Sequence, residues 1–151
     1  MTDTKVIVIG GGVAGLTAAG ELARLNIRVD LVERSPFPGG HAIAFACKAT
    51  EQCVKCGACL VADRMEKAAA NPKVRILTGT QVRQVLRNGR FEVHVYQKPV
   101  FIDPSRCTGC GVCYDQCPET GAILKGCSPG HKPFYALSAN RCRYVKDHSC
   151  V

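Results

Sequence analysis

Lys5-Val-Ile-Val-Ile-Gly10-Gly-Gly-Val-Ala-Gly15 is the stretch that decides the fold. Its first part is a continuous apolar, β-branched run, the pattern of a strand buried on both faces in a parallel sheet. Apolar residues then recur at helical spacing over residues 16–25, and Asn26 is a stop signal. Residues 28–33 predict a second strand. The stretch therefore predicts a β-α-β unit with parallel, right-handed pairing, and an α/β, Rossmann-like half-domain.

The glycines of this stretch have the spacing G-x-G-x-x-G between a strand and a helix, the position in which such glycines hold a dinucleotide. Gly10 permits the tight turn, Gly12 lets the backbone approach a pyrophosphate, and Gly15 allows close helix–strand packing. The helix N-terminus adds oriented N–H groups for the phosphates. The predicted cofactor-binding residues of the turn are Gly10, Gly12, Val13, Ala14 and Gly15. The competing interpretation is a glycine-rich turn without a ligand.

Glu33 stands at the end of the second strand, at about the expected distance after the glycines. Its carboxylate would accept hydrogen bonds from a ribose, and its charge disfavours a 2′-phosphate. We therefore expect FAD or NAD rather than NADP.

The chain beyond Glu33 is irregular over residues 34–50 and then regains a pattern. Residues 60–70 predict a helix that ends before Pro72, and residues 74–77 predict a strand. Two further strands, 81–87 and 90–96, complete a β-meander.

The last two strands are joined by Asn88-Gly89, a dipeptide that favours a type I′ turn with positive φ at both residues. In the second of them Phe91, Val93 and Val95 alternate with polar residues. We expect one face of this hairpin to be packed and the other to face water.

The strongest motif is Cys107-x2-Cys110-x2-Cys113-x3-Cys117-Pro118. It matches the bacterial ferredoxin run, in which the first three thiolates hold one 4Fe-4S cluster and the fourth cysteine ligates another. Zinc is the competing metal, but zinc sites pair two Cys-x-x-Cys knuckles across a longer gap. A composition shift near Pro99 predicts a boundary between a Rossmann-like, dinucleotide-binding domain over residues 1–100 and a ferredoxin-like module over residues 101–151.

A related triplet lies earlier in the chain, with the same spacing and the same glycine after the middle cysteine. Together with a loosely spaced upstream cysteine it predicts a further cluster site, for which zinc is a competitor. Its residues are Cys47, Cys53, Cys56 and Cys59.

The remaining cysteines, Cys127, Cys142 and Cys150, would serve a second cluster together with Cys117. The first cluster would then lack its remote fourth ligand. Either one of these clusters is incomplete, or further ligands lie beyond residue 151. We expect the second, and therefore a module that is incomplete at its C-terminus. Two 4Fe-4S clusters are expected, and the earlier triplet allows a third.

Composition narrows the class of protein. The chain of 151 residues carries 11 cysteines and a net charge of +8. The odd cysteine count and a 46% hydrophobic content disfavour a disulfide scaffold and favour metal or redox use of the thiols in a reducing cytoplasm. No secretory signal or membrane span is expected. Basic residues are dispersed, so nucleic-acid binding is not expected, and their excess would offset the charge of bound clusters and a pyrophosphate.

In their order along the chain, these motifs resemble the N-terminal part of the A subunit of heterodisulfide reductase. The resemblance rests on Gly10–Gly15, Glu33-Arg34, Gly39-Gly40, both cysteine motifs and the hairpin. It implies FAD on the β-α-β unit and clusters that carry electrons to partner subunits, with electron bifurcation in some members. It also adds Arg34, Gly39 and Gly40 to the cofactor-binding residues. His41, directly after the glycine pair, is a further candidate for approach to a flavin.

The sequence thus predicts an electron-transfer subunit of a larger oxidoreductase complex, with substrate chemistry on other redox subunits and no catalytic acid, base or nucleophile of its own. One alternative is a flavin-free ferredoxin-type adaptor. The other is a zinc-stabilised binding module.

Overall fold

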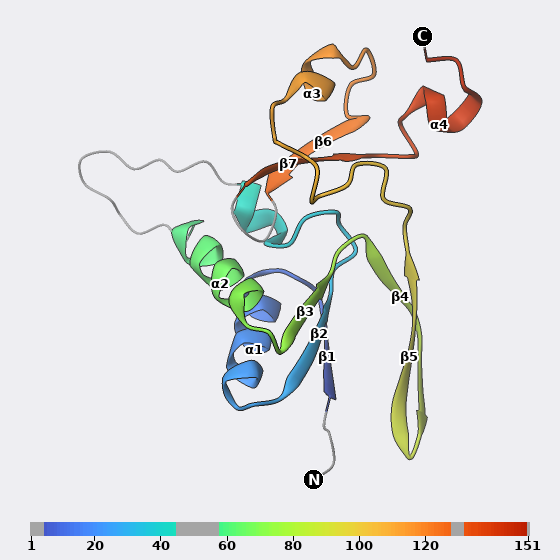
Figure 1. The fold of residues 1–151 in the computed structure, drawn as a ribbon. Helices are drawn as coiled ribbons and strands as arrows, with labels where there is room; N and C mark the ends of the chain where they lie inside the picture. The colour runs from blue at the N-terminus through green and yellow to red at the C-terminus, as the bar shows by residue number, and fades with distance from the viewer. Residues whose placement is uncertain (1–4, 45–57, 128–131, 151) are drawn as a thin grey trace, which may run out of the picture. The chain divides into compact units, whose positions relative to one another are not determined.

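The computed structural model describes residues 5–44, 58–127 and 132–150. The chain divides into two compact units, Met1–Lys98 and Pro99–Val151 (Figure 1). Each unit has its own secondary structure and is described by itself.

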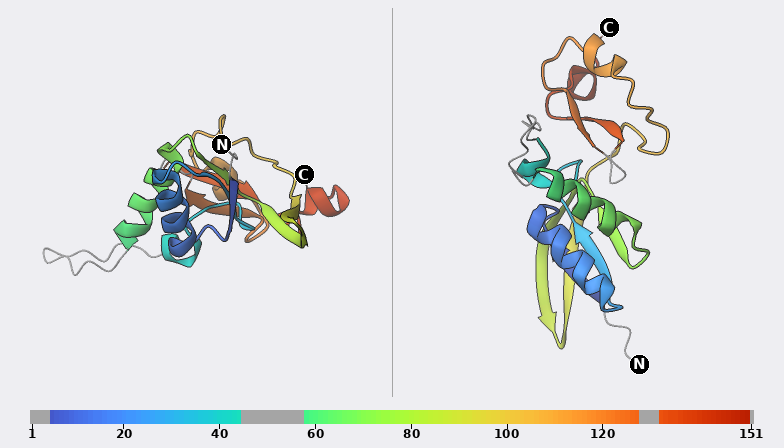
Figure 2. Two further views of the ribbon diagram at one scale, coloured as in Figure 1. Left: turned by 90° about the horizontal axis from the view of Figure 1, so that it is seen from below. Right: turned by 90° about the vertical axis from the view of Figure 1, so that its left-hand side faces the viewer.

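The first unit contains a three-stranded parallel sheet in the order β1-β2-β3. The strands are β1 (Lys5–Ile9), β2 (Arg28–Val32) and β3 (Val74–Leu77). Helices α1 (Val13–Arg24) and α2 (Ala58–Ala70) lie together on one face of the sheet (Figures 1 and 2). The predicted β-α-β unit and the α/β class are confirmed. The expected burial of the first strand on both faces was wrong: Ile7 is 38% and Ile9 61% exposed, because β1 is the last strand on its side of the described sheet.

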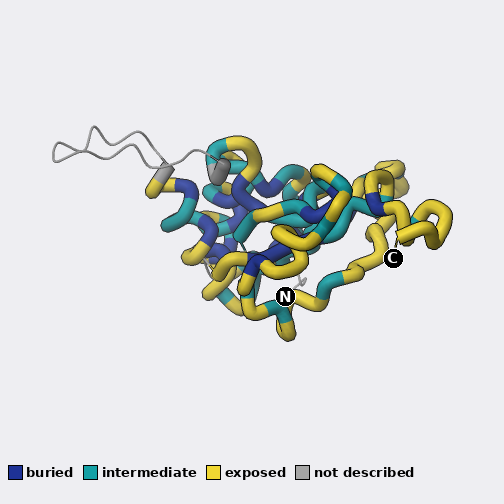
Figure 3. Tube along the Cα trace, turned by 90° about the horizontal axis from the view of Figure 1, so that it is seen from above, coloured by how far each residue is buried: buried dark blue, intermediate teal, exposed yellow. Residues whose placement is uncertain are grey.

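The core of the first unit is formed by buried residues of the sheet and of these helices, and Figure 3 colours the buried segments dark blue. Leu31 of β2, Leu16 of α1 and Met65 of α2 are at most 1% exposed. Burying side chains of this size is the main favourable contribution to folding. The sheet is thus anchored through its central strand.

Helix α1 begins three residues before the predicted start, with Gly12 as its N-cap. It ends at Arg24, one residue before the predicted end, because Asn26 adopts a left-handed conformation (φ 67°). The N–H groups of Asn26 and Ile27 then donate to the carbonyls of Ala23 and Leu22, as in a Schellman cap.

A charged row crosses the second face of the sheet. Asp30 of β2 is 7% exposed and accepts from Lys5 of β1 (2.6 Å) and from the Arg75 guanidinium of β3 (2.7 and 3.0 Å). Burial by itself would raise the pKa of Asp30, but the hydrogen bonds from Arg75 and Lys5 hold it below its usual value. The row joins all three strands: Arg75 is the register partner of Asp30 on β3, and Lys5 reaches Asp30 diagonally from β1.

The hairpin of β4 (Thr80–Asn88) and β5 (Arg90–Gln97) forms as predicted, with a bulge between Val82 and Gln84. Two expectations about it were wrong. Only Gly89 of the turn dipeptide has positive φ, because Asn88 remains paired with Arg90. The apolar face is not packed: Phe91 is 69% and Val95 46% exposed. Alternation of apolar and polar residues indicates which residues share a face of the hairpin. It does not show whether another helix or strand packs on that face.

The second unit contains a two-stranded antiparallel sheet, β6 (Ile123–Cys127) and β7 (Pro133–Leu137). Two five-residue helices, α3 (Val112–Gln116) and α4 (Arg143–Asp147), flank it in sequence. An ion pair between Arg143 and Glu119 ties α4 to the segment after α3. In the part of the chain that the structure describes, no helix is long and apolar enough to span a bilayer.

Candidate functional site

The glycine turn joins β1 to α1 and is held by backbone contacts. Gly10 has a φ of +104°, a region that glycine enters without strain, and its N–H donates to the Val32 carbonyl (2.8 Å). A Cβ on Gly15 would lie 1.8 Å from the Gly10 carbonyl oxygen. Only glycine at position 15 therefore permits this turn to close against the helix.

The first turn of α1 offers N–H groups to a ligand. The helical ladder starts with the Leu16 N–H, which donates to the Gly12 carbonyl (2.9 Å). The preceding amides, those of Val13, Ala14 and Gly15, have no carbonyl partner within the helix. They are suited to a pyrophosphate, because N–H groups and the helix dipole both favour negative charge.

Glu33 connects the end of β2 to this turn. Its side chain is 8% exposed, and its Oε2 accepts from the Gly11 N–H at 2.7 Å. Its Oε1 accepts from the N–H of Ser35 at 2.7 Å and lies 2.8 Å from the Ser35 hydroxyl. The carboxylate therefore sits beside the glycine turn, where a ribose contact requires it, and it also braces the turn itself.

The Gly39-Gly40 pair closes over the same turn. The Gly39 N–H donates to the Gly11 carbonyl at 2.6 Å, and a Cβ on Gly40 would lie 3.2 Å from the Gly12 Cα. Both glycines have positive φ. The predicted flavin candidates beside them, Arg34 and His41, are exposed, and His41 lies in the 3-10 helix η1 (Gly40–Ala44).

The cysteine loop of the second unit rests on β7. Gly109 and Gly111 have positive φ. A Cβ on Gly109 would lie 2.6 Å from the Pro133 carbonyl oxygen, and one on Gly111 would lie 3.1 Å from the Tyr135 hydroxyl. The loop can approach the strand this closely because both positions lack side chains.

Hydrogen-bond donors surround one sulfur of this loop. Hydrogen bonds from the Val112 backbone N–H and then from the Thr108 side chain lower the pKa of the Cys110 thiol. Such bonds stabilise a thiolate, the form that binds iron. A 4Fe-4S cluster is bound by cysteine thiolates at this spacing, and N–H groups that hydrogen-bond to sulfur stabilise it. The residues of the loop therefore fit such a cluster.

The thiols of the loop differ in exposure. Cys110 and Cys113 are exposed, while Cys107 and Cys117 are half-buried. Over residues 5–44, 58–127 and 132–150, no three Cys, His, Asp or Glu side chains lie close enough to hold a metal ion.

The other predicted ligands are placed unequally. Cys142 is buried, Cys127 is half-buried, and Cys59 and Cys150 are exposed. The remaining members of the earlier motif, Cys47, Cys53 and Cys56, lie outside the described residues.

The second unit contains a structural repeat that the cysteine spacing did not reveal. The N–H groups of Arg106 and Cys107 both donate to the Asp103 carbonyl, and those of Arg141 and Cys142 both donate to the Ser138 carbonyl. The sequence signal is an Arg-Cys pair at the end of each turn. Cys142 thus occupies the same place in its turn as Cys107 does.

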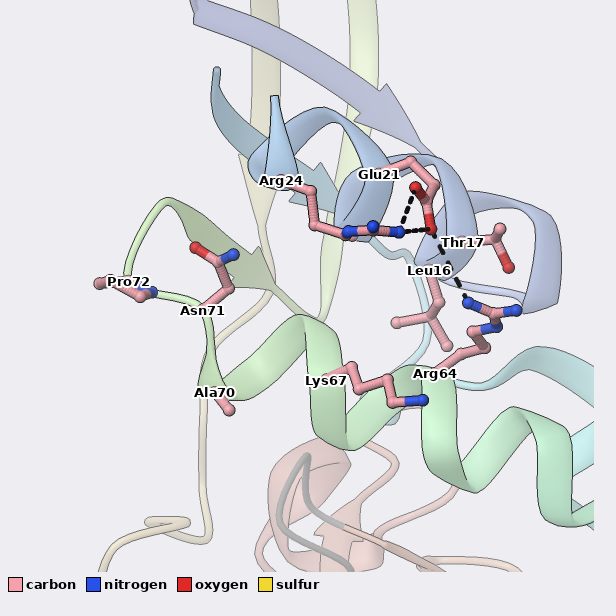
Figure 4. Close-up of a pocket in the computed structure, with 10 residues that line it drawn as sticks. Leu16, Thr17, Glu21, Arg24, Arg64, Lys67, Ala70, Asn71 and Pro72 are labelled. Carbon is pink, nitrogen blue, oxygen red and sulfur yellow. Dashed lines mark hydrogen bonds and ion pairs between the residues drawn. The ribbon is translucent and has the colours of Figure 1, made fainter. Parts of the chain in front are cut away.

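A groove of about 570 Å³ runs between α1 and α2 (Figure 4). Its charged side chains are largely paired: Arg24 bonds Glu21 at 3.0 Å, and Arg64 lies 3.9 Å from the same carboxylate. None of its lining residues is a predicted ligand-binding residue. The groove therefore shares no lining residue with the predicted dinucleotide site.

Both sites match known protein families. Residues 8–66 match a family described as NAD(P)-binding Rossmann-like domain, and residues 98–119 match a 4Fe-4S binding domain. The crystal structure of L-proline dehydrogenase from P. horikoshii is similar to 62% of this chain, with a TM-score of 0.50 and 27% identity, and the match covers 19% of that chain. The chain therefore has the architecture of an iron–sulfur redox protein with a Rossmann-like domain.

Curated relatives identify the family. A protein of Archaeoglobus profundus described as similar to the A subunit of heterodisulfide reductase is 40% identical over 79% of this chain. The first iron–sulfur A subunit of the CoB–CoM heterodisulfide reductase of Methanopyrus kandleri is 37% identical over 77%. The A subunit of the ferredoxin:CoB–CoM heterodisulfide reductase of Methanosarcina acetivorans is 35% identical over 97%.

The chain is related in sequence to the heterodisulfide reductase A subunits and their homologues, the family that the order of motifs predicted. It spans 17 to 18% of the length of these relatives.

Sequence reasoning missed two residues that shape the sites. Ser35 contacts the Glu33 carboxylate through two groups, and the signal was its position two residues after a predicted ribose ligand. Tyr135 lies against Gly111 of the cysteine loop, and only the pairing of β6 with β7 brings it there.

Proposed function

We propose that this chain forms the flavin-binding and first iron–sulfur part of an electron-transfer subunit. The proposal rests on two features of one chain. The first is a glycine turn whose Gly11 N–H donates to Glu33, and the second is a cysteine loop in which hydrogen-bond donors contact Cys110. The sequence relationship to heterodisulfide reductase A subunits supports the same conclusion.

FAD is the dinucleotide that we assign to the glycine turn. The amides of Val13, Ala14 and Gly15 would bind its pyrophosphate, and Glu33 would accept from its ribose. FAD supplies two-electron chemistry and a 4Fe-4S cluster supplies single-electron steps. The part of this chain is to bind and position both groups, through backbone amides at the turn and thiolates at the loop.

The cluster with the most support is the one on the loop Cys107, Cys110, Cys113 and Cys117. A second cluster would use Cys127, Cys142 and Cys150, and a third would use the earlier cysteine motif. We assign the electron donors and acceptors to other redox subunits in the cytoplasm, because many reduced thiols require a reducing compartment. We include flavin-based bifurcation as an activity of the full assembly, since it needs a two-electron carrier beside one-electron carriers.

Anaerobic reconstitution of the chain with FAD, iron and sulfide tests the proposal. We expect visible flavin bands that survive cluster extraction, and about four iron atoms per occupied cluster site. Glu33→Gln should weaken FAD binding, whereas the matched change Glu21→Gln, on an exposed face of α1, should leave it unchanged.

Two outcomes would contradict the proposal in different ways. Iron without flavin would favour the flavin-free adaptor. Stoichiometric zinc in place of iron in the protein isolated anaerobically would favour the zinc-stabilised module.

A further inference from the structure

Ser35 is bonded to the ribose-ligand candidate through both its backbone and its side chain. Its N–H donates to the Glu33 Oε1 at 2.7 Å, and its hydroxyl lies 2.8 Å from the same oxygen. The hydroxyl also lies 2.6 Å from the Phe37 carbonyl, so its single proton is shared between two acceptors. The contacts of Ser35 with Glu33 and with Phe37 lie in the loop after β2, outside any helix or strand.

The backbone around Ser35 is fixed independently of the Glu33 side chain. The Gly79 N–H donates to the Ser35 carbonyl at 2.8 Å, and the Thr80 N–H donates to the Glu33 carbonyl at 2.8 Å. Thr80 is 2% exposed. Gly79 and Thr80 thus hold this segment through contacts that do not involve the glycine turn. Ser35 is therefore fixed in position and can orient the longer, more flexible side chain of Glu33.

The Glu33 side chain has several rotatable bonds, and its free conformers would carry the carboxylate away from the turn. Its Oε2 contact with Gly11 fixes one oxygen, and the two groups of Ser35 fix the other. Since a carboxylate offers about four lone-pair sites, lone pairs remain for the hydroxyls of a ribose.

We propose that Ser35 is the positioning residue of the dinucleotide site: it holds Glu33 in the one orientation that braces Gly11 and accepts from the ribose. The inference rests on the proposed function, because it assigns to the glycine turn a ligand with a ribose. It goes further in assigning part of the ribose selectivity to a residue that does not itself contact the ligand.

The chain contains a matched control. Ser105 makes the same pair of contacts with Asp103, through its N–H (2.8 Å) and its hydroxyl (2.7 Å), at the same separation of two residues. It lies in the other unit. Ser105→Ala therefore removes an equivalent hydroxyl without touching the glycine turn.

The test is a calorimetric titration of the full chain with ADP and with 2′,3′-dideoxy-ADP. We expect Ser35→Ala to weaken ADP binding about tenfold, the effect of one hydrogen bond to a charged group. Binding of the dideoxy ligand should change much less, because it lacks the hydroxyls that Glu33 accepts from. Ser35→Thr, which keeps a hydroxyl, should restore ADP affinity, and Ser105→Ala should not alter it.

A second readout needs no ligand. Hydrogen exchange of the Gly11 amide should be about tenfold faster in Ser35→Ala than in the unmodified chain or in Ser35→Thr, because the acceptor of that amide is then less fixed. Unchanged exchange would overturn the positioning role.

The outcomes separate this inference from the proposed function. If the unmodified chain binds neither ADP nor FAD, the proposed function fails and the inference fails with it. If it binds ADP and Ser35→Ala binds equally well, only the inference is overturned. Equal losses for both ligands would also overturn it, because Ser35 would then support the turn alone.

Discussion

The glycine turn and the cysteine loop prepare their ligand-binding groups to different degrees. In the turn, Gly11 is bonded through both its N–H and its carbonyl, to Glu33 and to Gly39. In the loop, Gly109 and Gly111 allow the backbone to lie close to β7, but Cys110 and Cys113 are exposed. The polypeptide alone holds the backbone of the proposed dinucleotide site in place, whereas the proposed cluster site would be completed by its metal.

The difference follows from the ligands. A pyrophosphate is bound by backbone N–H groups, whose positions the fold itself determines. Thiolates repel one another and gain their stability from the metal, so that metal binding and local folding are one process. The two sites should therefore respond differently to substitution and to metal removal.

Gly15→Ala should have the largest effect on the turn. The added Cβ would lie 1.8 Å from the Gly10 carbonyl oxygen, a backbone atom that cannot move aside. We expect a loss of about 4 kcal/mol or more in the free energy of unfolding, measured by urea denaturation. The control is Gly20→Ala on the same helix, where a Cβ meets nothing within 4 Å. That change should stabilise by about 0.5–1 kcal/mol. Similar effects of the two substitutions would contradict the packing described for Gly15.

Cys110→Ser should separate metal binding from folding in the loop. Because Cys110 is exposed, the metal-free chain should keep its unfolding free energy within about 0.5 kcal/mol. Reconstitution should yield about four fewer iron atoms per chain, the content of one 4Fe-4S cluster.

The comparison variant for the loop is Cys142→Ser, at a buried cysteine. It should destabilise even the metal-free chain, by about 1–3 kcal/mol, because it buries a hydroxyl in place of a thiol. If metal-free Cys110→Ser were also destabilised, the loop would be ordered without its metal, as the glycine turn is without its ligand.

Asp30→Asn tests the sheet beneath the glycine turn. It removes the shared partner of Lys5 and Arg75 and should lower the unfolding free energy by about 1–3 kcal/mol near neutral pH. The folded-state pKa of Asp30 is lowered, so its contribution is fully present above the unfolded value of about 4 and is lost as pH falls through the lower folded value.

Urea unfolding of both proteins from pH 7 to pH 3 checks this dependence. The gap between wild type and Asp30→Asn should narrow below about pH 4. Asp63→Asn, which breaks the exposed pair with Lys67 on α2, should cost no more than about 0.5 kcal/mol. A constant gap across the pH range would refute the ion-pair explanation.

Phe91→Ala should have the smallest effect. The ring is 69% exposed and lies 5.8 Å from the Arg87 guanidinium, so its loss should change the unfolding free energy by about 0.5 kcal/mol or less. Met65→Ala, at a fully buried position of α2, should cost about 2–5 kcal/mol in the same assay. A comparable loss at Phe91 would mean that the hairpin face is packed after all.

Much of the first unit could be predicted because its signals are local. A β-branched run, glycines at fixed spacing and Asn26 each act on neighbouring backbone, and residues 74–77 form a strand within the predicted bounds. Motif order was sufficient to identify the family. The start of α1 was predicted too late, because glycine at an N-cap gives no side-chain signal.

The amino-acid sequence by itself determined the β-α-β unit, the glycine turn and the cysteine spacing, since these depend on backbone freedom and residue type along the chain. Only the tertiary structure decided that Ser35 and Gly11 share the Glu33 carboxylate, that Asp30 joins three strands, and that the apolar face of β4 and β5 is exposed. These features depend on which distant segments meet. The physical reason is that the spacing of residues along the chain determines the local backbone and the chemical groups it presents. The packing of distant segments determines which of those groups come into contact.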